Sequence, residues 1–222
     1  MNPGQPFIRW DWIADHTDDI WVRLANHLVL TLIAVGVGLL ISFPLALLIT
    51  RNKRTYTPVT SFAGILYTIP SLAAFGFLVP FTGFTVLTGE IALVSYTLLI
   101  LIRNIAAGLS NVPDDVKESA VGMGLSPAQV LWKVELPLAL PVIMAGVRVA
   151  TVTTIGLVTV TALIGLSNLG QFITDGINRN FRTPLILGAV LSIVLAVAAD
   201  LALLGVQRVI APWERRARRS AA

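Results

Sequence analysis

Three ionisable residues lie inside long apolar stretches of the sequence, where a charge is least expected. Arg103, Arg148 and Asp200 are each surrounded by mainly aliphatic residues. A lone charge in lipid hydrocarbon is energetically costly, so such side chains usually pair with an opposite charge or face water. We therefore predict that Asp200 forms an ion pair with Arg148 or Arg103. A pair that joins two membrane helices is favoured over a direct contact with a substrate.

Motifs for catalysis, nucleotide binding and metal binding are missing from the sequence. There is no G-x-x-x-x-G-K-[ST] loop to hold phosphates and no G-x-S-x-G turn to present a nucleophilic serine. The chain has no cysteine, and its two histidines, His16 and His27, have no metal-ligand spacing. Asp15 and Asp18 beside His16 fit a solvated polar face better than a metal site. We predict that the chain is not an enzyme and holds neither a metal nor a cofactor.

The composition indicates an integral membrane protein of the all-α class. Of the 222 residues, 55% are hydrophobic and 13% are charged, and the mean hydropathy is +0.81. Soluble domains carry about 25% charged residues, roughly twice this share. The net charge of +4 could suggest nucleic acid as a partner, but the basic residues cluster beside the apolar stretches. That distribution favours membrane orientation, with lipid and not nucleic acid around the chain.

Five apolar segments are long enough to cross a bilayer, because about 20 helical residues span its hydrocarbon core. They cover residues 28–50, 59–80, 91–110, 138–164 and 184–206. Between the last two, residues 166–183 are polar and contain glycine. We expect a short helix and a turn there, at the outer surface.

The second apolar segment carries a proline. Pro70 has no N–H to donate, so it breaks the helical hydrogen-bond ladder within residues 59–80. Such breaks are tolerated where a neighbour or a cavity satisfies the freed carbonyl group. The functional interpretation is a kink that lines a translocation pathway, with Tyr67, Ser71 and Asn104 as further lining residues. A kink that serves only helix packing is equally compatible with the sequence.

The first 27 residues are polar and rich in tryptophan. Trp10, Trp12 and Trp21 alternate with acidic residues, and the stretch lacks the basic start of a signal peptide. Indole rings prefer the water–lipid boundary, so we expect an interfacial segment over residues 1–27. For residues 1–9 a frayed tail is an equally good interpretation.

Residues 113–141 form the longest polar interruption between apolar segments, and they carry helix signals of their own. Pro113 suits the first position of a helix, and the two aspartates after it suit the positive end of the helix dipole. This first helix is predicted to run to about Met123. Gly122 and Gly124 then supply a stop and a bend, because glycine adopts a positive φ without strain.

A second short helix is predicted directly after this bend. Ser126 is a favourable N-cap and Pro127 a favourable first helical residue. The helix is predicted to end before Pro137. Two short helices joined by a glycine corner then lie between two spans, and a loop with its own secondary structure usually holds a partner.

The same segment resembles the EAA signature of the membrane subunits of ABC importers, which reads Glu-Ala-Ala, three residues, Gly, nine residues, Ile, any residue and Leu-Pro. The matching positions are Glu118, Ser119, Ala120, Gly124, Val134, Leu136 and Pro137. Ser119 replaces the first alanine and Val134 replaces the isoleucine, and both keep a small or β-branched side chain. The alternative is an amphipathic re-entrant loop of another transporter or a channel.

In the family that this signature identifies, the loop forms coupling helices that sit in a groove on a cytoplasmic ATPase. The resemblance implies that Glu118 is a polar anchor at the docking surface. Ala120 would be small so that the helix can approach its partner closely. Gly124 would make the corner, and Leu136 with Pro137 would fix the start of the fourth span. None of these residues is expected to be catalytic.

Stretches outside the signature resemble one branch of these importers, the permeases for osmoprotectants such as glycine betaine, carnitine and choline. They are residues 69–73, 103–104 and 134–148. Residues 165–170 have fewer glycines than that branch has after the fourth span, which leaves the shape of the outer loop open. Permeases for amino acids or methionine share the signature, and secondary transporters and channels are rival classes.

The resemblance also implies partners. A permease of this branch pairs with itself or with a sister permease, binds two copies of an ABC ATPase and receives substrate from an extracytoplasmic binding protein. ATP and Mg²⁺ then belong to the ATPase. We expect residues 1–222 to form one transmembrane domain of the cell membrane, with residues 113–137 as its coupling loop.

The orientation in the membrane follows from the basic residues, which favour the cytoplasmic side. With five spans and the N-terminus outside, eleven of the sixteen basic residues face the cytoplasm. They are Arg51, Lys53, Arg54, Arg103, Lys117, Lys133, Arg208, Arg215, Arg216, Arg218 and Arg219. We therefore predict an outside N-terminus, a cytoplasmic C-terminus and a cytoplasmic 113–137 segment.

Overall fold

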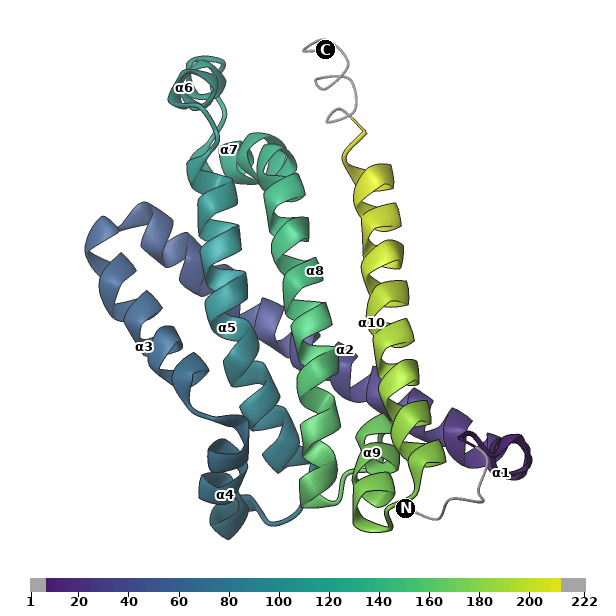
Figure 1. The fold of residues 1–222 in the computed structure, drawn as a ribbon. Helices are drawn as coiled ribbons and strands as arrows, with labels where there is room; N and C mark the ends of the chain where they lie inside the picture. The colour runs from purple at the N-terminus through teal and green to yellow at the C-terminus, as the bar shows by residue number, and fades with distance from the viewer. Residues whose placement is uncertain (1–6, 213–222) are drawn as a thin grey trace.

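The structure, a computed structural model, describes residues 7–212, and every regular element in that range is helical (Figure 1). The α-helices are α1 (Trp10–Asp15), α2 (Thr17–Arg51), α3 (Tyr56–Thr68), α4 (Ser71–Thr82), α5 (Val86–Ser110), α6 (Asp114–Gly122), α7 (Pro127–Val130), α8 (Leu136–Val160), α9 (Leu169–Asn178) and α10 (Arg182–Ile210). Short turns complete them: η1 (Lys53–Thr55), the π-helical η2 (Leu131–Glu135) and η3 (Thr161–Ile164). The predicted all-α class is confirmed. Arg215, Arg216, Arg218 and Arg219, which support the predicted orientation, lie outside the described residues.

Four helices in the described range are long and apolar enough to cross a membrane. They are α2, α5, the continuous run Pro127–Ile164 and α10. The remaining predicted span, residues 59–80, consists instead of two helices, Lys53–Thr68 and Ser71–Thr82, bent by 93°. The predicted count of five therefore holds only if this bent pair is a single span.

The bend is much sharper than the kink that we predicted from Pro70. Helix α3 stops at Thr68, and Ile69 and Pro70 have ψ angles of 125° and 135°. A proline disfavours the helical conformation of the residue before it, which explains the extended Ile69. The sequence thus places the break correctly and misses its size: α4 leaves the direction of α3 at nearly a right angle.

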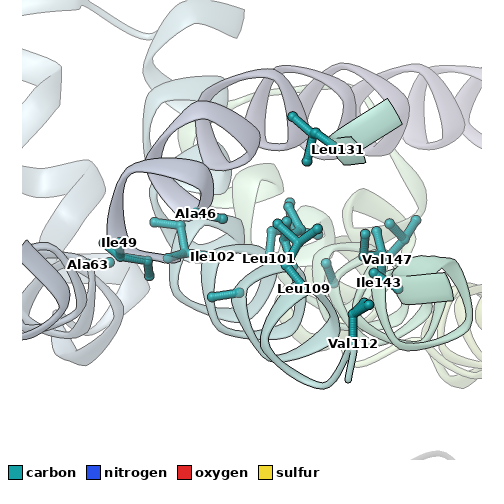
Figure 2. Packing of buried hydrophobic residues seen from close by; sticks show 14 of the residues in the cluster. Ala46, Ile49, Ala63, Leu101, Ile102, Leu109, Val112, Leu131, Ile143 and Val147 are labelled. Carbon is teal, nitrogen blue, oxygen red and sulfur yellow. The ribbon is translucent and has the colours of Figure 1, made fainter. Parts of the chain in front are cut away.

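Helix α5 lies at the centre of the fold and packs against α2 and α8, while α10 leans on α8 and α9 (Figure 1). Buried side chains from α2, α3, α5 and α8 form the larger apolar core. Figure 2 shows members of this cluster: Ala46, Ile49, Ala63, Leu101, Ile102, Leu109, Val112, Leu131, Ile143 and Val147. Helices α2, α5 and α8 therefore form the packed centre of the fold.

Two glycines allow the helices of this frame to approach closely. A Cβ atom added at Gly38 of α2 would collide with the side chain of Thr97 in α5. A Cβ atom added at Gly146 of α8 would collide with Asn104 of α5. Small residues have this role in membrane helix packing, because lipid offers no hydrophobic force that pushes helices together.

The first helix packs against the segment that connects α8 to α10. Trp12 stacks on His16, with ring centroids 4.0 Å apart, and meets the edge of Phe172 in α9. Helix α9 and the turn after it confirm the short helix and turn predicted for residues 166–183. The interfacial position of residues 1–27 stays a prediction.

Candidate functional site

The first candidate site is the 113–137 segment, whose corner is built as a glycine C-cap. Helix α6 ends at Gly122, and Gly124 has a φ of +83°. Its N–H donates to the carbonyl of Val121 (2.9 Å), and the N–H of Leu125 donates to the carbonyl of Ala120 (3.2 Å). These two bonds define a Schellman motif. The corner thus depends on Gly124, whereas Gly122, also predicted to bend the chain, stays helical.

Helix α7 begins where the sequence predicts, with a complete capping box. The N–H of Ser126 donates to the side-chain oxygen of Gln129 (2.8 Å), and the N–H of Gln129 donates to the hydroxyl oxygen of Ser126 (3.4 Å). Pro127 occupies the first turn. The corner therefore carries a backbone cap on each side, a Schellman motif at the end of α6 and a capping box at the start of α7.

The predicted end of this second helix is wrong. The α-helical turns stop at Val130, but the backbone continues through the π-turn η2 into α8, so that Pro127–Ile164 is one helical run. The N–H of Leu136 donates to the carbonyl of Leu131, five residues back. Pro137 follows in the first turn of α8, where a missing N–H is tolerated. The proline therefore marks the end of the π-turn and not of the helix.

The side chains of the segment divide into a buried and an exposed set. Ala120 is 2% exposed, so its small side chain packs inside this chain and does not face a partner as we predicted. Glu118 is exposed, and near it Val121 and Met123 are 60% and 74% exposed. The exposed set thus combines one acidic and two apolar side chains. Ser119 is exposed, and Val134, Leu136 and Pro137 are partly buried along η2 and the start of α8.

The second candidate site is an ion pair between two membrane helices. Arg148 of α8 meets Asp200 of α10 in a bidentate contact, with Nε–Oδ1 and Nη2–Oδ2 distances both 2.8 Å. The prediction that Asp200 pairs with an arginine is confirmed, and the partner is Arg148. Arg103 lies elsewhere, on α5, in a cleft of about 240 Å³ that Tyr56 also lines.

The predicted pathway residues fall into two places. Tyr67, Pro70 and Ser71 surround the break between α3 and α4, where the Tyr67 ring meets the edge of Tyr96. Asn104 is separate: its side-chain amide donates to the carbonyl of Ile100 (2.8 Å), and its side chain packs on Gly146. Its surroundings are those of a helix-packing residue. The pathway role of all four residues stays a prediction.

Two buried polar residues were missed from the sequence. His27, fully buried in α2, donates from Nε2 to the carbonyl oxygen of Ile155 in α8 (3.0 Å). Glu90 of α5 is 8% exposed, and neither carboxyl oxygen has a hydrogen-bond partner among the described residues. Both lie directly before a predicted span, His27 before residues 28–50 and Glu90 before residues 91–110. Only the longer helices of the structure bring them inside.

Among residues 7–212 no group of three or more His, Cys, Asp and Glu side chains is placed to hold a metal ion. The first site is a capped corner between two short helices, the second of which is continuous with α8. The second site is an ion pair between α8 and α10.

The family and the similar proteins found by comparison are all components of transport systems. Residues 25–215 match the family described as binding-protein-dependent transport system inner membrane component. The osmoprotectant import permease protein OsmW of Salmonella typhimurium is 39% identical over 192 residues, which cover 84% of this chain and 89% of the relative. The choline transport system permease protein OpuBB of Bacillus subtilis is 37% identical, with 87% and 89% covered. The carnitine transport permease protein OpuCB of Listeria monocytogenes is also 37% identical, with 83% and 85% covered.

A solved structure shows the same fold. An inward-facing form of the methionine ABC transporter MetNI contains a chain that superposes with a TM-score of 0.79 at 21% sequence identity. The match covers 88% of this chain and 98% of that one.

Proposed function

The chain belongs to the family of binding-protein-dependent transport system inner membrane components, and we propose that it is the permease subunit of an ATP-driven importer for a compatible solute. It is a multi-pass protein of the cell membrane. The solute class is the one named for the relatives: glycine betaine, carnitine or choline, each with a quaternary ammonium group. The observation that carries the proposal is the 37–39% identity to such permeases over more than four fifths of the chain.

The 113–137 segment is the surface on which the ATPase docks. Glu118 and Val121 of α6 and Met123 directly after it are exposed and would supply one polar and two apolar contacts at the capped corner. Helix α7 continues through η2 into α8. A displacement of α7 is therefore transmitted to α8, because a continuous helix bends little between its two parts. This continuity supports a coupling role for the segment.

The mechanism is alternating access. Two ATPase copies, which carry ATP and Mg²⁺, close on nucleotide and move the docked helices α6 and α7. The membrane helices of this chain and of a second permease, the same or a sister chain, then rock between inward-facing and outward-facing arrangements. A binding protein outside the cell delivers the solute. The 113–137 segment and the C-terminus are cytoplasmic, which the distribution of basic residues supports.

Uptake by proteoliposomes tests this proposal. The permease is reconstituted with its ATPase, and labelled glycine betaine, carnitine and choline are offered with the binding protein, with and without ATP. We expect uptake of at least one of them that requires both ATP and the binding protein. Uptake that persists without ATP would indicate a secondary transporter or a channel, and uptake of methionine alone would contradict the solute class.

A further inference from the structure

We propose that the cleft beside Arg148 and Asp200 is a weak binding site, inside the membrane, for a zwitterionic solute with a quaternary ammonium group and a carboxylate. The inference rests on the proposed function, because it names where the transported solute is contacted between the two sides. Arg148 would bind the carboxylate and Asp200 the ammonium group.

The cleft has the size and lining that such a solute needs. It is an open groove along α8 with a volume of about 400 Å³, bordered on the side of α10 by Asp200, and it is large enough to admit a small solute. Besides the ion pair, it is lined by side chains of α8 only: Ala145, Val149, Val152 and Thr153. Three of these four are small and aliphatic, and they suit the methyl groups of a trimethylammonium head.

The ion pair keeps unused binding capacity. The bidentate contact uses Nε and Nη2 of Arg148, and Nη1 has no hydrogen-bond partner in the described part of the chain. Each carboxylate oxygen of Asp200 accepts one bond from Arg148 and retains a further lone pair. A solute carboxylate can therefore reach Nη1, and an ammonium group can approach Asp200, while the pair stays intact.

The exposure of the pair indicates that it faces a polar space. The Arg148 and Asp200 side chains are 25% and 31% exposed, although both lie in helices that cross the membrane. Charges that face hydrocarbon are costly, so this side of α8 and α10 meets water or protein in the assembled transporter, and such charges mark substrate pathways. A cleft that faces water can bind the solute, whereas a cleft that the second permease covers cannot. A binding measurement distinguishes these two arrangements.

The pairing also explains why the site would be weak. When it is empty, each charge already has an opposite partner at 2.8 Å, so the solute replaces water and adds contacts without rescuing an unpaired charge. A site along a transport pathway must bind the solute strongly enough for it to enter and weakly enough for it to leave. An ion pair whose charges already neutralise each other binds the solute weakly in this way. Adjacent opposite charges further favour a zwitterion over a solute with a single charge.

The first test uses the wild-type permease–ATPase complex in detergent, without the binding protein, and saturation transfer to ligand methyl protons measured by NMR. Glycine betaine is compared with choline, which lacks the carboxylate, and with 3,3-dimethylbutyrate, in which carbon replaces the ammonium nitrogen. We expect glycine betaine to bind about tenfold more tightly than either analogue, the effect of one charge-assisted contact. Equal affinities, or no transfer to glycine betaine, overturn the site.

The second test assigns the binding to the pair. The double variant Arg148→Gln/Asp200→Asn removes both charges and keeps polar side chains that can hydrogen-bond; Asn matches Asp in size, and Gln is shorter than Arg. We expect its affinity for glycine betaine to fall about tenfold and the preference over the analogues to vanish. The control is Arg179→Gln, the same exchange on an exposed arginine outside the spans, which should bind like wild type. Unchanged binding in an assembled double variant overturns the site, and if that variant does not assemble, the wild-type ligand comparison decides.

Uptake by the wild-type transporter separates a failure of the site from a failure of the proposed function. A reconstituted complex that transports none of these solutes contradicts the proposed function itself. A complex that transports them with ATP, yet shows no charge-dependent binding in detergent, contradicts only the site at Arg148 and Asp200.

Discussion

The hydroxyl group of Tyr96 in α5 donates a hydrogen bond to the carbonyl oxygen of Ile69, with 2.7 Å between the two oxygens. Ile69 lies between α3 and α4, so its carbonyl belongs to neither helix and has lost the donor that a continuous helix would supply. In a membrane, an unsatisfied carbonyl is costly. The side chain of a distant helix therefore stabilises the bend that Pro70 begins.

Removing this hydroxyl should loosen the bend. We expect Tyr96→Phe to lower the free energy of unfolding by about 1 kcal/mol, because the Ile69 carbonyl, which no helix satisfies, loses its hydrogen-bond partner. Thermal unfolding of the purified complex measures the loss. Tyr67→Phe is the matched control: the Tyr67 ring lies 6.2 Å from that of Tyr96, but its hydroxyl makes no hydrogen bond within residues 7–212. Equal melting of the two variants would contradict the role of Tyr96.

The corner at Gly124 should be sensitive to any side chain. Its φ is +83°, and no atom lies within 4 Å of the position that a Cβ would occupy. Gly124→Ala therefore suffers only the backbone cost of the left-handed conformation, about 1–2 kcal/mol. We expect the protein to stay in the membrane while uptake per ATP hydrolysed falls. Gly122→Ala, in open space on the helical side of the corner, should keep the wild-type ratio. Full coupling in Gly124→Ala would remove the corner from the mechanism.

The ion pair should tolerate exchange of its charges better than the loss of one. We expect Asp200→Ala to destabilise the protein by about 2 kcal/mol, because Arg148 is left without a partner inside a span. The exchanged variant Arg148→Asp/Asp200→Arg restores an opposite pair and should assemble with its partners. Membrane abundance and copurified ATPase report the outcome. An exchanged protein that is degraded while the single variant survives would argue against the pair as a link between α8 and α10.

The contact between α5 and α8 should depend on a glycine. We expect Gly146→Ala to destabilise the protein by about 1–3 kcal/mol, because the added methyl group overlaps Asn104 and one helix must shift. Gly156→Ala, on the same helix with no atom within 4 Å, is the control and should melt at or above the wild-type temperature. Comparable melting of both variants would show that the two helices can separate at no cost.

Local signals account for most of what the sequence predicts correctly. Pro113, Gly124 and Ser126 act on neighbouring backbone through caps and a positive φ, so their effects are readable without the fold. The apolar runs give the spans for the same reason. The sequence could not show that Asp200 pairs with Arg148 and not with Arg103, because the partner depends on which face of α8 meets α10.

The sequence-based predictions were wrong where contacts with distant residues, or the exact ends of helices, determine the structure. The 93° bend carries a hydrogen bond from Tyr96, which lies outside residues 59–80, so this contact could not be predicted from that segment. His27 and Glu90 looked like polar flanks because apolar runs mark the hydrocarbon core and not the ends of the helix. Pro137 looked like a terminator, since a π-turn leaves no composition signal of its own.

The π-turn at Leu131–Glu135 affects how α8 is rotated about the helix axis relative to α7 in the run Pro127–Ile164. The wide turn takes up one residue more than an α-helical turn, so α7 and α8 stay nearly in phase across it. A residue inserted into α8 before Arg148, where no wide turn takes it up, would rotate the guanidinium group by about 100° away from α10. The π-turn therefore fixes the direction in which Arg148 points relative to the surface of α7.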